Sequence, residues 1–215
     1  MPQTFIYLHG FASSPQSAKA DYLLERFSSV QIPLQIPDLN QGDFSHLTIT
    51  RQLRQVEAEF PAPPMPVTLI GSSLGGWIST ILAQRQQQCT SLVLLAPAFQ
   101  FLSHWLPRLG EPLLKQWKTE GYLSVYHYGE KRSLPLSYEF ITDAQNYQDF
   151  ECARPIPTLI LHGRYDEVIP IESSRAFCSE RSWVKLIELE SDHALGNVLP
   201  KIWQAIQHFC HCHHK

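Results

Sequence analysis

The chain has 215 residues, of which 44% are hydrophobic and 17% charged, as expected for a globular protein with one sizeable core. Its net charge of -3 lacks the basic excess of nucleic-acid-binding domains, so we exclude nucleic acid as a partner. No apolar run reaches the roughly 18 residues of a membrane span, and the N-terminus lacks signal-peptide features. The cysteines, five in number and without CxxC spacing, favour a reducing compartment, so we expect a cytoplasmic protein.

Short apolar runs of strand length alternate with segments of helical periodicity along the chain. The runs cover residues 4–9, 34–37, 66–71, 91–96, 157–162 and 184–190. Helical spacing relates Ile49, Leu53, Val56 and Phe60, then Ile78, Ile81 and Leu82, and finally Ile202, Ile206 and Phe209. This alternation predicts an α/β fold in three layers, with a mostly parallel sheet covered by helices on both faces.

Residues 71–75, Gly-Ser-Ser-Leu-Gly, match the G-x-S-x-G pattern of a nucleophile elbow. In this motif the serine occupies a strained turn between a strand and a helix, which exposes its hydroxyl. Ser73 follows an apolar run and precedes the helical pattern that begins near Ile78, so the required context is present. The pattern alone is short, and it indicates a nucleophile only if an acid and a histidine follow later in the chain.

An acid and a histidine follow the last two predicted strands. Asp166 comes after the fifth apolar run, and His193 comes after the sixth. Because parallel strands present their carboxyl ends at one edge of a sheet, we expect both side chains near Ser73. His193 would accept the serine proton, and Asp166 would orient and stabilise the imidazole. Glu167 and Asp192 are alternative acids, but Glu167 would face away across its loop, and Asp192 adjoins the histidine in sequence.

The first predicted strand ends in YLHGF, which indicates one half of an oxyanion hole. The backbone N–H groups of Leu74, directly after the serine, and of Phe11 would donate to the developing oxyanion. Gly10 permits a tight turn there, although an ordinary strand-ending turn would explain the same residues. We interpret His9 and His162, the latter in a second Leu-His-Gly stretch, as structural histidines rather than as bases.

Residues 98–153 break the alternation of strands and helices. Prolines and glycines interrupt a region rich in apolar side chains, and a Gly-Glu turn at 129–130 divides its second half. We predict broken helices and a hairpin that form a lid-like insertion over the strand ends, within a single domain 1–215. The candidates to line an acyl pocket above the serine are Phe101, Trp105 and Trp117. Packing of the insertion onto the sheet would by itself explain most of these apolar residues.

Four stretches together, IYLHGFASSPQSAK, LIGSSLGGW, ILHGRYDEVIP and DHAL, resemble the small bacterial esterases of the YqiA type within the α/β-hydrolase superfamily. The resemblance extends from residue 4 to about residue 210. It implies the α/β-hydrolase fold, with Ser73, Asp166 and His193 as a catalytic triad. The two leading antiparallel strands of that superfamily are expected to be absent, since the predicted oxyanion strand begins at residue 4.

The leading hypothesis is a serine esterase or thioesterase that cleaves a small-molecule acyl ester or thioester through an acyl-enzyme, without cofactor or metal. A carbon–carbon hydrolase or lyase of the same superfamily is an alternative. The related enzymes of menaquinone synthesis tend to have an arginine where this chain has Trp77, which disfavours that reading. A non-catalytic binding protein with a hydrolase fold is a third possibility, and such proteins usually lack a triad residue.

The C-terminal tail carries residue types that bind metals, namely Cys210, His211, Cys212, His213 and His214. Ligands so close in sequence rarely complete a tetrahedral structural site. We therefore interpret this segment as a solvated tail that binds metal at most adventitiously.

Overall fold

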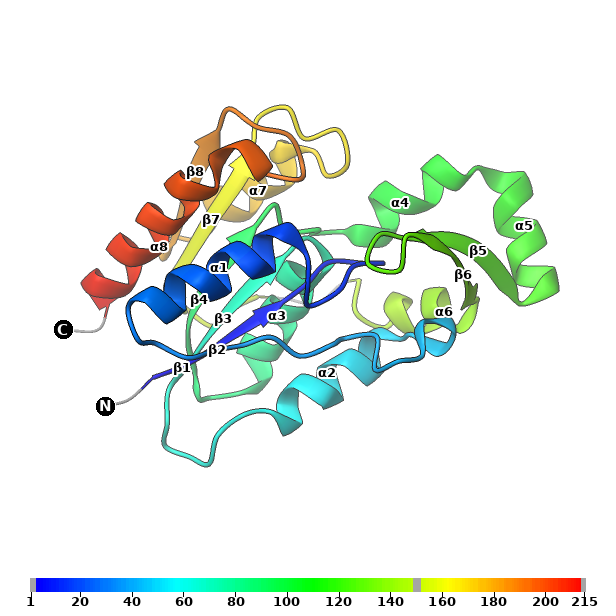
Figure 1. Cartoon of the computed structure of the whole chain (residues 1–215). Coiled ribbons are helices and arrows are strands. Elements are labelled where there is room, and N and C mark those ends of the chain that lie inside the picture. Colours follow the sequence, from blue (N-terminus) through cyan, green and yellow to red (C-terminus); the bar gives the residue numbers. More distant parts are fainter. Residues whose placement is uncertain (1–2, 149–151, 214–215) are drawn as a thin grey trace.

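The computed structural model describes residues 3–148 and 152–213, with side chains up to Cys210. Its main feature is a six-stranded sheet of order β2-β1-β3-β4-β7-β8, in which every neighbouring pair is parallel (Figure 1). The strands are β1 (Thr4–Leu8), β2 (Leu34–Gln35), β3 (Val67–Ser72), β4 (Cys89–Leu95), β7 (Thr158–Gly163) and β8 (Val184–Leu189). All the predicted strands are confirmed, and no antiparallel strand joins this sheet within the described ranges.

Helices cover both faces of the sheet. They are α1 (Ala18–Ser29), α2 (Ile49–Ala58), α3 (Leu74–Arg85), α7 (Ile171–Ser179) and α8 (Leu199–His213), with short 3-10 turns at Phe44–His46 and Gly196–Val198. Side chains of β1 alternate between two cores: Phe5 and Tyr7 pack with α1 and α8, whereas Ile6 and Leu8 pack with α2 and α3. This division gives the three layers visible in Figure 1 and confirms the predicted α/β architecture.

The chain between β4 and β7 forms an additional unit beside the carboxyl ends of the strands (Figure 1). It comprises α4 (Phe101–Leu109), α5 (Glu111–Glu120), β5 (Tyr122–His127), β6 (Arg132–Ser137) and α6 (Glu139–Gln145). Gly110, with a φ of 76°, separates α4 from α5, and β5 pairs with β6 as an antiparallel hairpin. The predicted broken helices and hairpin are therefore present. The part of the predicted insertion at 149–151 lies outside the described residues.

Arg154 attaches the returning chain to the end of α3. Its guanidinium donates hydrogen bonds of 2.6 to 3.0 Å to the carbonyl oxygens of Ala83, Gln86, Gln87 and Cys89. The last carbonyls of a helix have no partner within the helix, so a cation with several donors satisfies them well. The contact positions the end of the insertion against the layer that carries Ser73.

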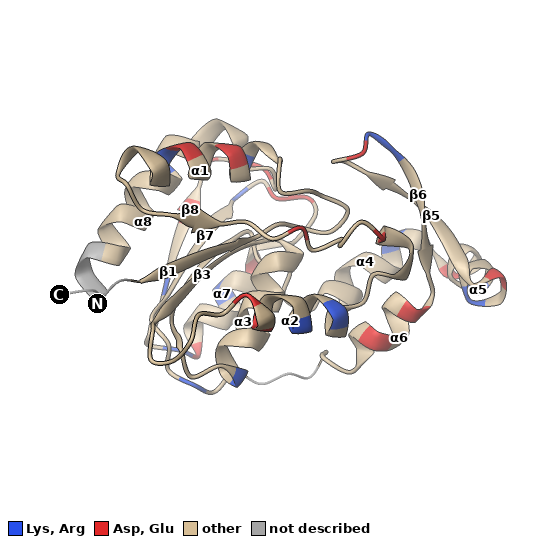
Figure 2. Cartoon of the chain, turned by 60° about the horizontal axis from the view of Figure 1, so that its bottom comes forward, with Lys and Arg blue, Asp and Glu red and all other residues tan. Residues whose placement is uncertain are grey.

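Charged residues lie on helices, loops and outer strands, whereas β1 and β3 carry none (Figure 2). This distribution is typical of parallel strands that are buried on both faces. Within the described ranges, no helix combines the length and the apolar character needed to cross a bilayer.

Candidate active site

Ser73 lies in a sharp turn between β3 and α3. Its φ of 53° and ψ of -117° fall in a region that residues other than glycine rarely adopt. Backbone hydrogen bonds hold the turn: Ser73 N–H donates to Leu95 O at 2.9 Å, and Ser73 O accepts from Ala98 N–H at 3.0 Å. The surrounding strands thus stabilise a strained backbone, and the serine side chain remains partly exposed.

Gly75 allows the first turn of α3 to approach β1 closely. A β-carbon at this position would overlap the backbone carbonyl groups of Leu8 and His9. The close contact also brings the loop after β1 alongside the serine, since a β-carbon on Gly10 would lie 3.3 Å from Ser73 Cβ. The glycine of the elbow motif is therefore required by packing, and it brings the predicted oxyanion loop next to Ser73.

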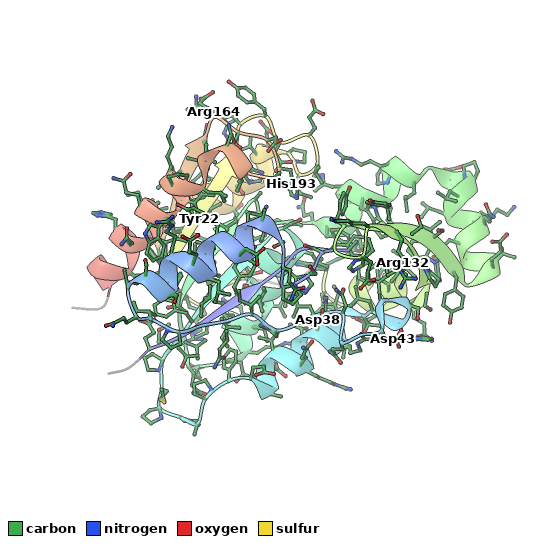
Figure 3. All side chains as sticks on the ribbon, viewed as in Figure 1. Tyr22, Asp38, Asp43, Arg132, Arg164 and His193 are labelled. Carbon is green, nitrogen blue, oxygen red and sulfur yellow. The ribbon has the colours of Figure 1, made fainter. Side chains whose placement is uncertain are left out.

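Loops after β3, β7 and β8 bring Ser73, Asp166 and His193 into one line of hydrogen bonds. His193 Nε2 lies 3.1 Å from Ser73 Oγ, and His193 Nδ1 lies 2.7 Å from Asp166 Oδ2. Figure 3 shows His193 in the loop region beyond the ends of the strands, on the side of the insertion. In this arrangement the imidazole can take a proton from the hydroxyl while the carboxylate holds its other nitrogen.

The Asp166 carboxylate is completely buried and accepts hydrogen bonds on both oxygens. Its Oδ1 accepts from the N–H groups of Val168 and Ile169, each at 2.8 Å. Its Oδ2 accepts from His193 and, at 3.1 Å, from His162 Nε2. Burial by itself raises the pKa of this carboxyl, but the hydrogen bonds from the two histidines outweigh burial and hold the pKa of Asp166 well below its ordinary value. The group is therefore ionised at neutral pH.

Neither alternative acid contacts the His193 ring within the described part of the chain. Asp192 is exposed, and its Oδ1 accepts from Leu195 N–H at 3.2 Å. The Glu167 side chain is also exposed, while its backbone carbonyl accepts a hydrogen bond from Arg108 of α4. The geometry therefore favours Asp166 over both.

His162 contacts the site in a way that the sequence analysis missed. Its ring is fully buried, with Nε2 3.1 Å from Asp166 Oδ2 and 3.0 Å from Ile169 O, and Nδ1 2.7 Å from Ser174 Oγ. Asp166 Oδ2 and Ile169 O can both only accept hydrogen bonds, so we assign the ring proton to Nε2. Nδ1 then accepts a hydrogen bond from the Ser174 hydroxyl. The only signal in the sequence was the four-residue spacing between His162 and Asp166.

His9 orients the peptide group that carries one predicted oxyanion donor. Its Nε2 accepts from Leu39 N–H at 3.1 Å, so the proton resides on Nδ1, which lies 2.9 Å from Gly10 O. The Gly10 carbonyl and the Phe11 N–H belong to one planar peptide, so holding the carbonyl also fixes the direction of the N–H. Within the described residues, neither this N–H nor that of Leu74 donates a hydrogen bond, and both remain available to a ligand.

The Phe11 side chain lies within an aromatic cluster that joins the oxyanion loop to the insertion. Its ring centroid lies 5.0 Å from that of Trp105, 5.2 Å from Phe140, 5.7 Å from Phe101 and 5.8 Å from Phe44. Such spacings are typical of favourable aromatic contacts. The cluster therefore links the position of α4 to the loop beside Ser73.

The three predicted pocket residues differ in exposure. Phe101 is buried, Trp105 is partly exposed, and Trp117 is completely buried. Trp117 packs 5.7 Å behind Trp105, and its indole N–H donates to Leu136 O at 2.9 Å. Trp105 therefore retains some exposed surface, whereas Trp117 has none.

A cavity of about 280 Å³ lies between α3 and α7. Trp77, Phe99 and Phe177 contribute its aromatic lining. Trp77 N–H lies 3.3 Å from Ser73 O, so the cavity begins one helical turn behind the elbow. Its lining is of mixed polarity, since polar side chains such as Thr80, Gln100 and Arg181 also contribute to it.

Within the side chains that the structure describes, no three His, Cys, Asp or Glu residues are grouped so that they could hold a metal ion. Cys210 is the last described side chain, and burial raises the pKa of its thiol to about 11. The other candidate metal ligands of the tail, at positions 211–214, have side chains that lie outside the described part of the structure.

Relatives with known names share this fold. The human protein "Palmitoyl-protein thioesterase ABHD10, mitochondrial" is 30% identical over 113 residues, which cover 51% of this chain and 37% of the human protein. The chain thus matches little more than a third of the length of that relative. The solved structure of mouse alpha/beta hydrolase domain-containing protein 10 superposes with a TM-score of 0.80 at 21% identity, covering 96% of this chain and 89% of the mouse chain.

A second solved structure, Est1E from Butyrivibrio proteoclasticus with bound ferulic acid, superposes with a TM-score of 0.78 at 20% identity and covers 98% of this chain and 89% of its own. These similarities confirm the α/β-hydrolase fold. The profile of the "Uncharacterised protein family (UPF0227)" matches residues 4–210, nearly the whole chain, in agreement with the resemblance to the YqiA type. The chain has the α/β-hydrolase fold and belongs to the UPF0227 family.

Proposed function

We propose that this protein is a serine hydrolase that cleaves acyl esters or thioesters through an acyl-enzyme on Ser73. The observation that carries the proposal is the pair of hydrogen bonds on His193, 3.1 Å to Ser73 Oγ and 2.7 Å to Asp166 Oδ2. A hydroxyl is a weak nucleophile at neutral pH unless a base takes its proton, and His193 lies within reach to do so. The strained serine turn and the ionised, buried acid are consistent with these roles.

In the first half of the reaction, His193 Nε2 removes the proton from Ser73 Oγ as the oxygen attacks the substrate carbonyl. The resulting imidazolium is stabilised by Asp166, which keeps its negative charge. The carbonyl oxygen becomes an oxyanion and accepts hydrogen bonds from Phe11 and Leu74 N–H. When the tetrahedral intermediate collapses, the bond to the leaving alcohol or thiol breaks, and Nε2–H returns the proton to that leaving group.

In the second half, a water molecule replaces the leaving group. His193 removes one proton from the water, and the hydroxide attacks the acyl carbon on Ser73. Collapse releases a carboxylic acid, and the proton held on the imidazole returns to Ser73 Oγ. The cycle consumes one water and restores the enzyme, so these residues suffice without a cofactor.

The substrate class is proposed from the aromatic surroundings of the site and from the named relatives. Phe11, Phe101 and Trp105 form an apolar wall beside the oxyanion loop, which suits an apolar acyl group better than a charged one. One relative is named as a palmitoyl-protein thioesterase, and a structural neighbour binds ferulic acid. We propose that the insertion 98–153, which contributes Phe101 and Trp105 to this wall, acts as a lid over the strand ends, within one hydrolase domain.

A fluorophosphonate probe tests the nucleophile directly. It should label the native protein at Ser73 and leave Ser73→Ala unlabelled. Ser72→Ala is the control: Ser72 is buried, so this variant should still be labelled at Ser73. Acyl esters and acyl thioesters of graded length, assayed with both variants, would then define the substrate class. Equal ester hydrolysis by native protein and Ser73→Ala would overturn the proposal.

A further inference from the structure

Lys19 contacts the backbone of the loop that carries His193, although the two residues are far apart in sequence. Its Nζ donates to Ala194 O at 3.0 Å and lies 3.5 Å from His193 O. Lys19 belongs to the first turn of α1, which follows directly on the predicted oxyanion loop. The neighbouring Ala20 and Leu23 are completely buried, so the backbone that carries the lysine is anchored in the core.

The loop from 192 to 195 is anchored at both ends, because Gly163 packs closely against Asp192 O and the Leu195 side chain is completely buried. Leu195 adopts a positive φ of 57°, and its N–H makes weak contacts with Asp192 O at 3.4 Å and Asp192 Oδ1 at 3.2 Å. Within the described residues, Lys19 is the side chain that donates to carbonyl groups of this segment. Without it, the carbonyls of His193 and Ala194 would have to be satisfied by solvent.

The ammonium group is charged at neutral pH and is influenced by two nearby carboxylates. Burial lowers the pKa of Lys19 to about 8, and the nearby charges of Asp166 and Asp192 oppose that effect. The titratable groups around it are therefore Asp166 after β7, and Asp192 and His193 after β8. A charged donor makes a stronger hydrogen bond to a carbonyl than a neutral one.

We propose that Lys19 is a positioning residue for His193, because its ammonium group holds the carbonyls of the histidine loop against the helix that follows the oxyanion loop. This inference rests on the proposed serine hydrolase mechanism. The contact of Lys19 with these carbonyls connects the two sides of the site. The oxyanion loop leads into α1, and Lys19 of α1 holds the loop that carries His193. Without the Lys19 contact, the His193 imidazole would move away from Ser73 Oγ, while the surface that binds the acyl group would not change.

The test compares Lys19→Met, Lys19→Gln and Lys19→Arg with Lys185→Met, an exposed lysine on β8, as the matched control. In Lys19→Met and Lys19→Gln we expect fluorophosphonate labelling and kcat for a short ester to fall about 10- to 100-fold, with KM nearly unchanged. Lys19→Arg should retain most of the rate. The guanidinium also remains charged above pH 8, so this variant should keep its kcat at alkaline pH where the native enzyme begins to lose activity.

Amide hydrogen exchange gives a readout that does not depend on turnover. Exchange at Ala194 and Leu195 should become faster in Lys19→Met and stay unchanged in Lys185→Met. If Lys19→Met labels at the native rate and its loop exchange is unchanged while Ser73→Ala loses labelling, the role of Lys19 is overturned and the proposed function stands. Equal rate losses in the Lys19 and Lys185 variants would also overturn it. If Ser73→Ala is still labelled, the proposed function fails instead.

Discussion

His162 and His193 donate hydrogen bonds to the same oxygen of Asp166, although one ring is completely buried and the other is 22% exposed. The two distances to Oδ2 are 3.1 and 2.7 Å. The exposed imidazole can exchange protons with a substrate, whereas the buried one can only hold the carboxylate. His162, in the strand that precedes the Asp166 loop, thus holds the acid on the side away from the substrate, and His193 contacts the same carboxylate oxygen from the exposed side.

Replacement of His162 by phenylalanine should destabilise the protein, because Asp166 loses a buried donor. We expect the free energy of unfolding in urea to fall by about 1–3 kcal/mol. His46→Phe is the matched control: His46 also pairs with an aspartate, Asp43, at 2.9 Å, but both side chains are about half exposed, so the loss should be much smaller. Equal losses of unfolding free energy in the two variants would show that the buried His162–Asp166 pair stabilises the protein no more than the exposed pair does.

Acid should weaken the fold through Asp166. Its folded-state pKa is held below the ordinary value of 3.8, so the stabilisation is present above that value and is lost as pH falls through 3.8 toward the folded pKa. Urea unfolding between pH 6 and pH 3 should show a smaller decline for Asp166→Asn than for the native protein. The same decline in both would mean that other carboxylates dominate acid unfolding.

Asp166→Asn should also reduce ester hydrolysis strongly, by about 10⁴-fold if it behaves like other triad acids, because the imidazole loses its orienting anion. Asp192→Asn is the control from the neighbouring loop, and it should reduce kcat/KM far less. Both variants are compared at one pH with the same short ester. The opposite ranking would assign the acid to Asp192.

His9→Phe should slow acylation without abolishing it. The variant keeps a ring in the buried site but loses the Nδ1 donor that holds Gly10 O and thereby the Phe11 N–H. We expect fluorophosphonate labelling to slow by about 10²-fold, the lower end of the loss seen when an oxyanion donor is removed. His104→Phe is the control. His104 contacts Ser173 and not the Gly10–Phe11 peptide, so this variant should be labelled at the normal rate. Normal labelling of His9→Phe would show that His9 does not position the Phe11 N–H for acylation.

Acyl length should separate Trp105 from Trp117. Each methylene buried on the apolar wall contributes about 0.8 kcal/mol, so kcat/KM should climb with chain length and then stop climbing at a definite length. Trp105→Ala should move that length, because this side chain has exposed surface. Trp117→Ala should mainly reduce stability, by about 3–5 kcal/mol, because it empties a fully buried site.

If no folded variant of the insertion changes the length profile, the acyl group binds elsewhere. The cavity lined by Trp77, Phe99 and Phe177 would then be the place to test. Phe177→Ala, in α7 and outside the insertion, should then change the length profile with the same esters if the acyl group binds in this cavity.

Several local features were predictable from the sequence, and others with an equally local signal were missed. The hairpin of β5 and β6 follows from its Gly-Glu turn, and the elbow follows from glycine spacing. Helix α1 was missed, although Ala20, Leu23 and Phe27 recur at helical spacing after the N-cap Ser17. Helix α7 offered a weaker pattern, since Ile171 and Ser174 are its buried residues.

The sequence by itself determined the alternation of strands and helices, the elbow at Ser73, and the presence of an acid and a histidine after two late strands. Hydrophobic periodicity and turn chemistry act over a few residues, so a linear chain displays them. The tertiary structure alone decided which acid contacts His193, that His162 holds that acid, and that Lys19 contacts a loop 174 and 175 residues away. Those contacts depend on how parallel strands are ordered in the sheet and how their loops pack at its edge, where residues distant in sequence become neighbours.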